Sequence, residues 1–397
     1  MTGSGSSSSK QQFKRTKSNK TSTDDTSVSS KRPSAASSTF ERILIENNIF
    51  SDGYGYHQQV PVVQHANSAQ IQQKLAASRA SLSPSRRDKS EYERFKQANT
   101  TALSESKVMS RVMPFFSGQS SGTQIASEEN LVFNNLTSLT NGATVDPKPD
   151  LFDGASFTQV HSQIRKDLDS LIVPTKHVHA PIAPNYFFEA KSSLGLPHEG
   201  RRQITYDIAA GSRAMNALQN YREVSTAPYD GNAYTLGATY HASGLLKIYA
   251  GHMHPGQTGP ETHVTQVKGF DITGDAETYY KGVGALRNAR DLAYELRNDL
   301  IQSSNSKAQA AEHQPQVLQY VVEDADEDED EDEDGDEDEP TTVTRPSVVS
   351  SRAAGAPSSR TRTSTTRATE PNTRSKRGRS PSPPSPRRTR SGAGKRR

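Results

Sequence analysis

The chain has 397 residues, with 48 Lys and Arg against 45 Asp and Glu, and only 31% of it is hydrophobic. Because globular domains are usually roughly 45–50% apolar, we expect one ordered domain of about 200 residues between disordered tails. The absence of cysteine excludes disulfides, thiol nucleophiles and thiolate metal sites. No stretch approaches the roughly 18 apolar residues of a membrane span, so we expect no membrane insertion.

Charge is concentrated in two opposite blocks. Residues 323–339 contain 15 Asp and Glu in 17 residues, and residues 340–397 contain 15 Lys and Arg against one Glu. Like charges at this density repel, so we expect an acidic disordered tract followed by a basic disordered tail.

These charged blocks suggest partners. Basic clusters such as 374–379 are typical of nuclear import or nucleic-acid binding, and the acidic tract could bind basic proteins. The alternative is that the tail binds its own acidic neighbour. Residues 1–9 lack the apolar core of a signal peptide. We therefore expect an intracellular protein, in the nucleus or otherwise in the cytoplasm.

Hydrophobic periodicity predicts several helices. A short helix is expected at 39–50, where Phe40 and Leu44 follow a Thr cap. From residue 90 the spacing of Tyr92 and Phe95 predicts a helix that continues to about residue 112. Further helices are expected at 128–139, 157–172, 201–221 and 276–301.

Strands are expected where apolar runs are short. Prolines exclude helix at 145–152, so this stretch is expected to be extended. The aromatic run 185–191 is typical of a buried strand. The Ser243–Gly244 turn predicts a hairpin. Further strands are expected at 234–239, 245–250 and 262–270.

Helices before, between and after a group of strands predict an α/β (α+β) domain with a mixed central sheet flanked by helices. The predicted organisation is 1–38 disordered and rich in Ser, Thr and Lys, 39–50 short helix, 51–89 linker, 90–305 folded domain, 306–322 linker, 323–339 acidic tract and 340–397 basic tail rich in Ser, Arg and Pro.

Candidate chemistry lies at the strand 185–191. Alternate side chains of a strand share a face, so Glu189 and Lys191 would point the same way. A carboxylate can hold a hard cation such as Mg²⁺, usually with a second carboxylate and several waters, and Asp150 could be that second ligand. The ammonium group could orient a water or stabilise charge on a phosphate.

The following helix offers supporting groups. Gln203 and Tyr206 are three residues apart, so a helix presents both on one side, and Arg202 could meet a phosphate. The Glu-x-Lys spacing alone is weak, because Glu105-Ser-Lys107 also matches it. The simpler interpretation of Glu189 and Lys191 is a surface ion pair worth at most ~1 kcal/mol.

The order of these motifs resembles the PD-(D/E)xK nuclease-like superfamily, and more closely a fungal family assigned to it. The resemblance covers about residues 90–301 and is carried by Val108-Met-Ser-Arg-Val-Met-Pro114, Lys148-Pro-Asp-Leu-Phe-Asp-Gly154, Pro184-Asn-Tyr-Phe-Phe-Glu-Ala-Lys191, Arg202-Gln-Ile-Thr-Tyr-Asp207, Gly211-Ser-Arg-Ala-Met215, Tyr229-Asp-Gly-Asn-Ala-Tyr-Thr235 and Arg287-Asn-Ala-Arg-Asp291. It implies a mixed sheet flanked by helices, Asp150 and Glu189 as Mg²⁺ ligands, Lys191 as the catalytic lysine and Gln203 as a supporting polar residue. An upstream acid, Glu128 or Glu129, would complete such a site.

Histidines form a competing candidate. His177-Val-His179 and His252-Met-His254 are His-x-His pairs, with His263 near the second pair, and a zinc or iron centre could use two or three of them. We expect both pairs to lie in loops. Two other classes of function stay open, a catalytically inactive nuclease fold that binds nucleic acid or protein, and a scaffold that acts through its charged tails.

Overall fold

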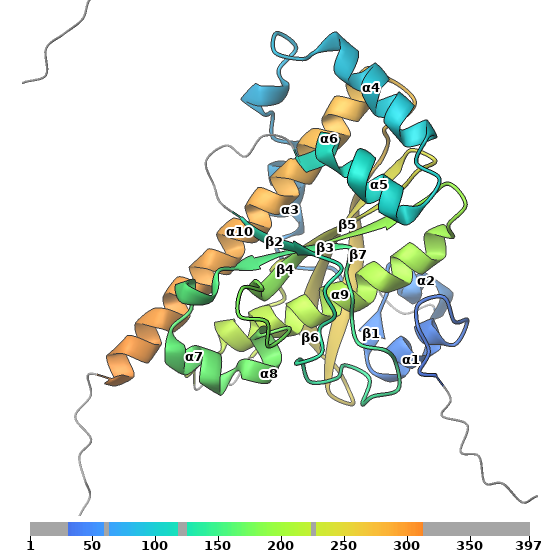
Figure 1. Ribbon diagram of the computed structural model, residues 1–397. Coiled ribbons are helices and arrows are strands. Elements are labelled where there is room, and N and C mark those ends of the chain that lie inside the picture. The colour runs from blue at the N-terminus through green and yellow to red at the C-terminus, as the bar shows by residue number, and fades with distance from the viewer. Residues whose placement is uncertain (1–30, 59–62, 118–124, 224–227, 313–397) are drawn as a thin grey trace, which may run out of the picture. The chain divides into compact units, whose positions relative to one another are not determined.

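The computed structural model describes residues 31–58, 63–117, 125–223 and 228–312 (Figure 1). These residues belong to one compact unit. The predictions for the acidic tract, the basic tail and most of the N-terminal disordered segment lie outside the described residues.

Helices and strands alternate along the chain, as expected for a mixed domain. The strands are β1 (Ile49–Phe50), β2 (Ala126–Glu129), β3 (Leu151–Ala155), β4 (Ile182–Lys191), β5 (Thr235–His241), β6 (Leu245–Pro255) and β7 (Pro260–Asp271). The helices are α1 (Phe40–Glu46), α2 (Tyr54–Gln58), α3 (Ser68–Ala76), α4 (Lys89–Thr100), α5 (Glu105–Arg111), α6 (Met113–Ser117), α7 (Ser162–Asp167), α8 (Asp169–Ile172), α9 (Pro197–Gln219) and α10 (Ala276–Glu312), with 3₁₀ turns at Ala80–Leu82 and Phe157–Gln159.

The strands form one seven-stranded sheet in the order β1-β7-β6-β5-β4-β3-β2. The pairs β1–β7 and β4–β5 are parallel, and the other pairs are antiparallel. The sheet is therefore mixed and flanked by helices, which confirms that part of the predicted fold class.

Helices cover the sheet on both faces (Figure 1). On one face, α9 packs Ile204 and Ile208 against Phe187 of β4 and Tyr249 of β6. On the other face, α3 and α10 pack against residues such as Phe188 of β4. The two faces of β4 thus look into different cores, and alternate residues along this strand serve different purposes.

The contact between α9 and the sheet is close. A Cβ atom at Gly251 of β6 would lie 2.1 Å from Cγ2 of Ile208, and one at Gly211 of α9 would lie 2.6 Å from the Phe187 ring. Because real Cβ contacts are never that short, both positions require glycine. The packing holds the middle of α9 against β4 and β6.

The predicted hairpin is present. Strands β5 and β6 pair antiparallel from Thr235 with Gly251 to His241 with Leu245. Gly244 in the turn has a φ of 103°, a conformation that favours glycine. The predicted strands 185–191 and 262–270 are β4 and β7, and the predicted helices 201–221 and 276–301 are α9 and α10.

The helix predicted at 128–139 is wrong. Glu128 and Glu129 belong to β2, Asn130 has a positive φ of 55°, and no helix follows before β3. The backbone N–H of Phe133 donates instead to Pro147 O at 2.9 Å, and that of Thr137 donates to Ser170 O at 2.8 Å. Long-range hydrogen bonds to a neighbouring loop and to α8 replace the helical ladder.

Other predicted boundaries shift. The helix predicted at 157–172 is divided into a 3₁₀ turn, α7 and α8. The helix predicted from residue 90 is divided between α4 and α5, because Ser104 begins a new helix by accepting from Lys107 N. The stretch 51–89, expected to be a linker, contains α3, whose Ile71 and Leu75 are buried in the core. None of the helices in the described part of the chain combines the length and apolarity needed to cross a bilayer.

One buried ion pair joins α10 to the sheet. Arg290 donates to both carboxylate oxygens of Asp153 in β3 at 2.8 and 2.7 Å, and the Asp153 side chain is 1% exposed. Burial by itself would lower the pKa of Arg290, but the charge of Asp153 and its hydrogen bonds, together with smaller contributions from Tyr186 and Asp291, raise that pKa above its ordinary value, so the guanidinium is held charged. The two-point contact fixes β3 beside α10.

We predict that Arg290→Ala lowers the free energy of unfolding by about 3–5 kcal/mol, because it leaves a buried carboxylate without its cation. Urea denaturation of the full chain measures the change. Lys281→Ala is the control, because its ion pair with Glu277 is 63% and 69% exposed and should contribute less than ~1 kcal/mol. Equal losses in the two variants would contradict the assignment.

Candidate active site

Asp150 and Glu189 lie side by side at the end of the β3–β4 ladder. Leu151 pairs with Phe188, so one further step of the register places Asp150 opposite Glu189. The backbone N–H of Asp150 donates to Glu189 Oε1 at 3.1 Å, and that of Ala190 donates to Asp150 Oδ2 at 2.8 Å. Each carboxylate is therefore held by the backbone of the other strand.

A third carboxyl group comes from α9. Asp207 lies against Glu189, and the two carboxyl groups can share a hydrogen bond only if one of them carries a proton. Glu189 is fully buried and Asp207 is 2% exposed. Glu189 Oε2 and Asp207 Oδ2 have no other hydrogen-bond partner among the described residues. The pair thus presents two buried oxygens that a proton or a cation could satisfy.

Burial and mutual repulsion raise the pKa of all three groups. Burial, followed by the charges of Asp207 and Asp150, raises the pKa of Glu189 well above its ordinary value. Burial raises the pKa of Asp207 to about 8. Burial also raises the pKa of Asp150, although its hydrogen bond from Ala190 N and the charge of Lys191 act in the other direction. The cluster holds protons that ordinary carboxyls have lost at neutral pH.

Lys191 points to the same face of β4. Its Nζ lies 2.9 Å from Glu105 Oε1 at the start of α5, and the Lys191 side chain is 5% exposed. Its methylenes pack on glycines, because a Cβ at Gly200 would lie 3.2 Å from Lys191 Cγ and one at Gly195 would lie 3.3 Å from Lys191 Cβ. The absence of side chains there lets the loop and the first turn of α9 close over the lysine.

The supporting residues lie elsewhere on α9. Gln203 is partly exposed on α9, one helical turn before Asp207. Tyr206 is buried, and its hydroxyl is 2.9 Å from the Thr144 hydroxyl. Gln203 therefore lies one turn from Asp207 on α9. Tyr206 contacts Thr144 instead of the carboxylate cluster.

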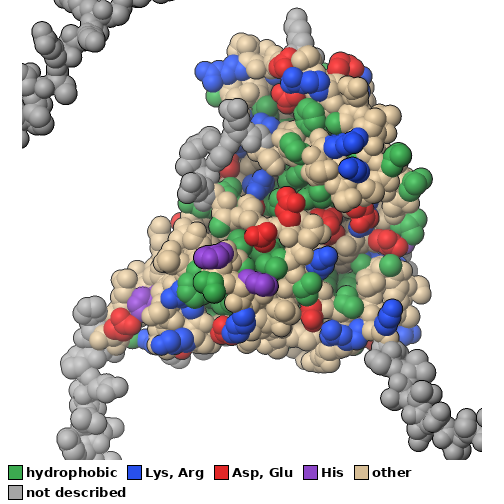
Figure 2. Space-filling model, viewed as in Figure 1, with side chains coloured by type: hydrophobic (Ala, Val, Ile, Leu, Met, Phe, Trp, Pro, Cys, Tyr) green, Lys and Arg blue, Asp and Glu red, His purple; other side chains and the backbone are tan. Residues whose placement is uncertain are grey.

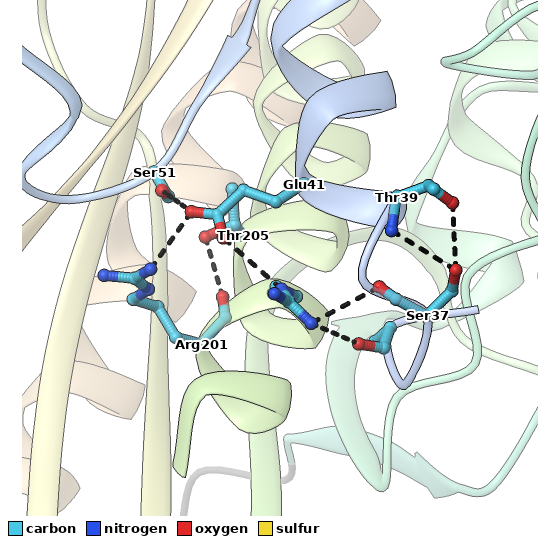
Figure 3. A network of polar contacts seen from close by, with 8 residues as sticks. Ser37, Thr39, Glu41, Ser51, Arg201 and Thr205 are labelled. Carbon is cyan, nitrogen blue, oxygen red and sulfur yellow. Dashed lines mark hydrogen bonds and ion pairs between the residues drawn. The ribbon is translucent and has the colours of Figure 1, made fainter. Parts of the chain in front are cut away.

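Arg202 is engaged by the N-terminal segment. It donates to Glu41 Oε2 at 3.3 Å and to the carbonyls of Ala35 and Ser37 at 3.2 and 3.3 Å. Figure 3 shows the Glu41 carboxylate of α1 beside Ser51 and Arg201, both of which donate to it. In this arrangement Arg202 fastens α1 to α9, and its predicted contact with a phosphate stays a prediction.

A pocket of about 270 Å³ adjoins Lys191. Its lining includes five basic side chains, Lys191, His198, Arg201, His241 and Lys247, together with the aromatic Tyr249. Such a lining suits an anionic group of modest size.

On the visible face, Figure 2 shows acidic side chains in a band across the region where α5, β2 and β3 lie, and such a band attracts cations.

The resemblance implies an upstream acid near the site, and Glu105 is an acid that the structure brings to Lys191. The sequence favours Glu128 or Glu129 for this role, but both are exposed residues of β2, whereas Glu105 contacts Lys191 and its charge contributes to the raised pKa of Asp150. In the sequence, Glu105 stands out only as part of a second Glu-x-Lys match that is interpreted as chance, so its contact with Lys191 is not predicted. From the sequence, no role is predicted for Asp207, although it lies one helical turn after Gln203.

The side chains fit a hard divalent cation in their chemistry. Glu189 and Asp207 each carry an oxygen without a hydrogen-bond partner among the described residues, and Asp150 adds a carboxylate whose Oδ2 accepts from Ala190 N. Carboxylate oxygens are the ligands that Mg²⁺ takes in proteins, and water completes its coordination. The potential ligand atoms of Asp150, Glu189 and Asp207 in the described residues do not all lie within 4.8 Å of one another. Their spacing is therefore wider than that of ligands that already surround one ion. Asp150 and Glu189 would be the ligands, and Asp207 would hold Glu189 in place.

Comparison with known proteins gives no relative: no family model, no curated protein and no solved structure matches the chain. The resemblance to the PD-(D/E)xK superfamily therefore stays a prediction from the motifs. The case for a function rests on the side chains of the site itself.

We predict that Asp207→Asn flattens the dependence of stability on pH. The folded chain keeps the Asp207 proton up to about pH 8, whereas the unfolded chain loses it near the ordinary value of 3.8. Between these values unfolding releases a proton, so the free energy of unfolding falls as pH rises, by at most ~1.4 kcal/mol per pH unit for each such group. Asn donates to Glu189 as the protonated acid does, but it does not titrate.

Urea denaturation between about pH 5 and pH 8 checks this slope in the absence of divalent cations. Asp299→Asn is the matched control, because Asp299 is exposed on α10. A slope in Asp207→Asn as steep as that of the wild type would show that the carboxyl is ionised in the folded chain.

Proposed function

We propose that this protein is a metal-dependent nuclease-like protein of the PD-(D/E)xK type that acts on nucleic-acid phosphodiesters. The observation that carries the proposal is the meeting of Asp150 and Glu189 on adjacent strands, with Lys191 on the same face of β4. Two acids 39 residues apart in the chain and one lysine are thereby brought to a single place.

Each residue has a role that its surroundings support. Asp150 and Glu189 would hold Mg²⁺, which when bound polarises a phosphoryl oxygen and lowers the pKa of its water. Lys191 would stabilise negative charge on the phosphate after leaving Glu105. The basic pocket formed by His198, Arg201 and Lys247 would bind a neighbouring phosphate. Gln203 would support the site from α9.

The tails extend the proposal. We propose that the basic tail at 340–397 adds electrostatic affinity for nucleic acid, and that the acidic tract at 323–339 competes with nucleic acid for it or binds basic proteins. A nuclear location follows from the same tail.

A second candidate is an inactive nuclease fold that binds nucleic acid or protein without cutting. The closure of the site favours this candidate, because the Glu189 side chain is fully buried and Lys191 is already paired with Glu105. Only Asp150 and Glu105 are partly exposed in this cluster. Catalysis would require that Lys191 exchange Glu105 for a phosphate.

We predict that the wild-type protein cuts plasmid DNA or RNA only with Mg²⁺ or Mn²⁺, and that Lys191→Ala lowers the rate about 100-fold or more, because it removes a charge beside the phosphate. The full chain is used, because α1 and α3 pack on the domain. Gel analysis of single-turnover cleavage measures the rate.

Lys107→Ala is the matched control, since Lys107 belongs to the other Glu-x-Lys match and is exposed on α5. Thermal melting confirms that the variants fold. Cleavage that is equal in wild type and Lys191→Ala, or that needs no metal, would refute the enzyme. Salt-sensitive binding of the same substrates without cleavage would support the inactive binding module.

A further inference from the structure

A second cluster of ionisable side chains lies on the other face of the sheet. In the β6–β7 ladder, His252 pairs with His263 and His254 pairs with Glu261. Residues two apart in a strand share a face, so these four side chains stand together. Ile248 and Ala250 of β6 share this face and pack with α3 and α10, whereas Glu189 and Lys191 lie on the α9 face.

The cluster is tight enough for one ion. One potential ligand atom from each of His254, Glu261 and His263 lies within 4.8 Å of the other two. His263 Nε2 is 2.9 Å from Glu261 Oε2. The ring centroids of His252 and His263 are 5.6 Å apart, and those of His254 and His263 are 6.0 Å apart.

Several of the imidazoles have no partner. His252 is 2% exposed, and neither of its ring nitrogens makes a hydrogen bond among the described residues. The same is true of both nitrogens of His65, whose ring lies 5.9 Å from His252, and of His254 Nδ1. A buried polar atom without a partner costs about 1–3 kcal/mol. A row of such rings is costly in a purely structural role.

We propose that His254, Glu261 and His263 bind a divalent transition-metal ion of the Zn²⁺ class, with His252 beside them as a further nitrogen donor. Histidine nitrogens with one carboxylate are the ligands that zinc takes in proteins when a coordination position is left for water. Mg²⁺ prefers oxygen ligands, so this cluster selects a different ion from the carboxylate site.

The surroundings suit such a site. His252 is 2% exposed and the His263 side chain is 15% exposed, so both rings are largely withdrawn from water. The Phe50 ring of the edge strand β1 lies 5.1 Å from the His263 ring. A pocket of about 250 Å³ is lined by Glu261, His263 and the segment that begins at Phe50, and it gives the ion a path from solvent.

The test uses the full chain without an oligohistidine tag. Equilibrium dialysis against Zn²⁺, followed by elemental analysis, measures the bound metal per chain, and Co²⁺ absorption reports its coordination. We expect about one ion per chain, and a dissociation constant raised about 100-fold or more in His254→Ala/His263→Ala. Glu261→Gln, which keeps size and shape, should weaken binding at least about tenfold.

The control is His177→Ala/His179→Ala, which removes the chain's other His-x-His pair, exposed before β4. It should bind zinc as the wild type does. Circular dichroism shows whether each variant folds, and Glu261→Gln decides the matter if the double variant does not. The proposal is overturned if the wild type binds no zinc, if the His254/His263 variant and Glu261→Gln bind it as tightly as the wild type, or if the control loses it.

Discussion

Three carboxyl groups that cannot all be ionised at once dominate this structure. Asp150, Glu189 and Asp207 meet where the end of β4, the start of β3 and the third turn of α9 converge, and Glu189 is fully buried there. Removing several negative charges from water without a counter-charge costs several kcal/mol for each ion. The cluster therefore keeps protons or takes a cation, and the ammonium group of Lys191 on the same face of β4 is already paired with Glu105.

The fold supports this cluster with its closest packing. Gly211 and Gly251 let α9 lie on the sheet without a side chain between them, and Gly195 and Gly200 let the start of α9 cover Lys191. The alternation of β4 then separates two kinds of chemistry. Odd residues such as Glu189 face α9 and the carboxylates, and the opposite face of the same sheet carries the histidines of β6 and β7. Two ions of different chemistry would thus be kept apart by one layer of backbone.

Local patterns were sufficient for the parts of this arrangement that depend on neighbours in sequence. The aromatic run at 185–191 predicts β4, and its alternation predicts that Glu189 and Lys191 share a face, as the structure confirms. The approach of Asp150 to Glu189 follows from pairing β3 with β4, which the motif order suggests. The expectation that His252 and His254 lie in a loop is wrong, because β6 extends to Pro255 and pairs with β7 throughout.

The residues that sequence reasoning missed depend on long-range packing. In the sequence, Asp207 cannot be distinguished from other polar residues of an amphipathic helix. Its contact with Glu189 depends on the packing of α9 over β4. Glu105 looks like a chance match because its partner, Lys191, is 86 residues away along the chain. The helix expected at 128–139 fails for the same reason, since its N–H groups find carbonyls in a distant loop and in α8. No local pattern records such partners.

The most direct test of the account is a crystal structure of the full chain with Mn²⁺ at about pH 8, where competition from protons is weakest. The account predicts an anomalous difference peak within about 2.0–2.6 Å of carboxylate oxygens from both Asp150 and Glu189. A structure in which Asp207 and Glu189 still share a proton and the manganese lies only beside His263, or nowhere in the domain, would contradict it.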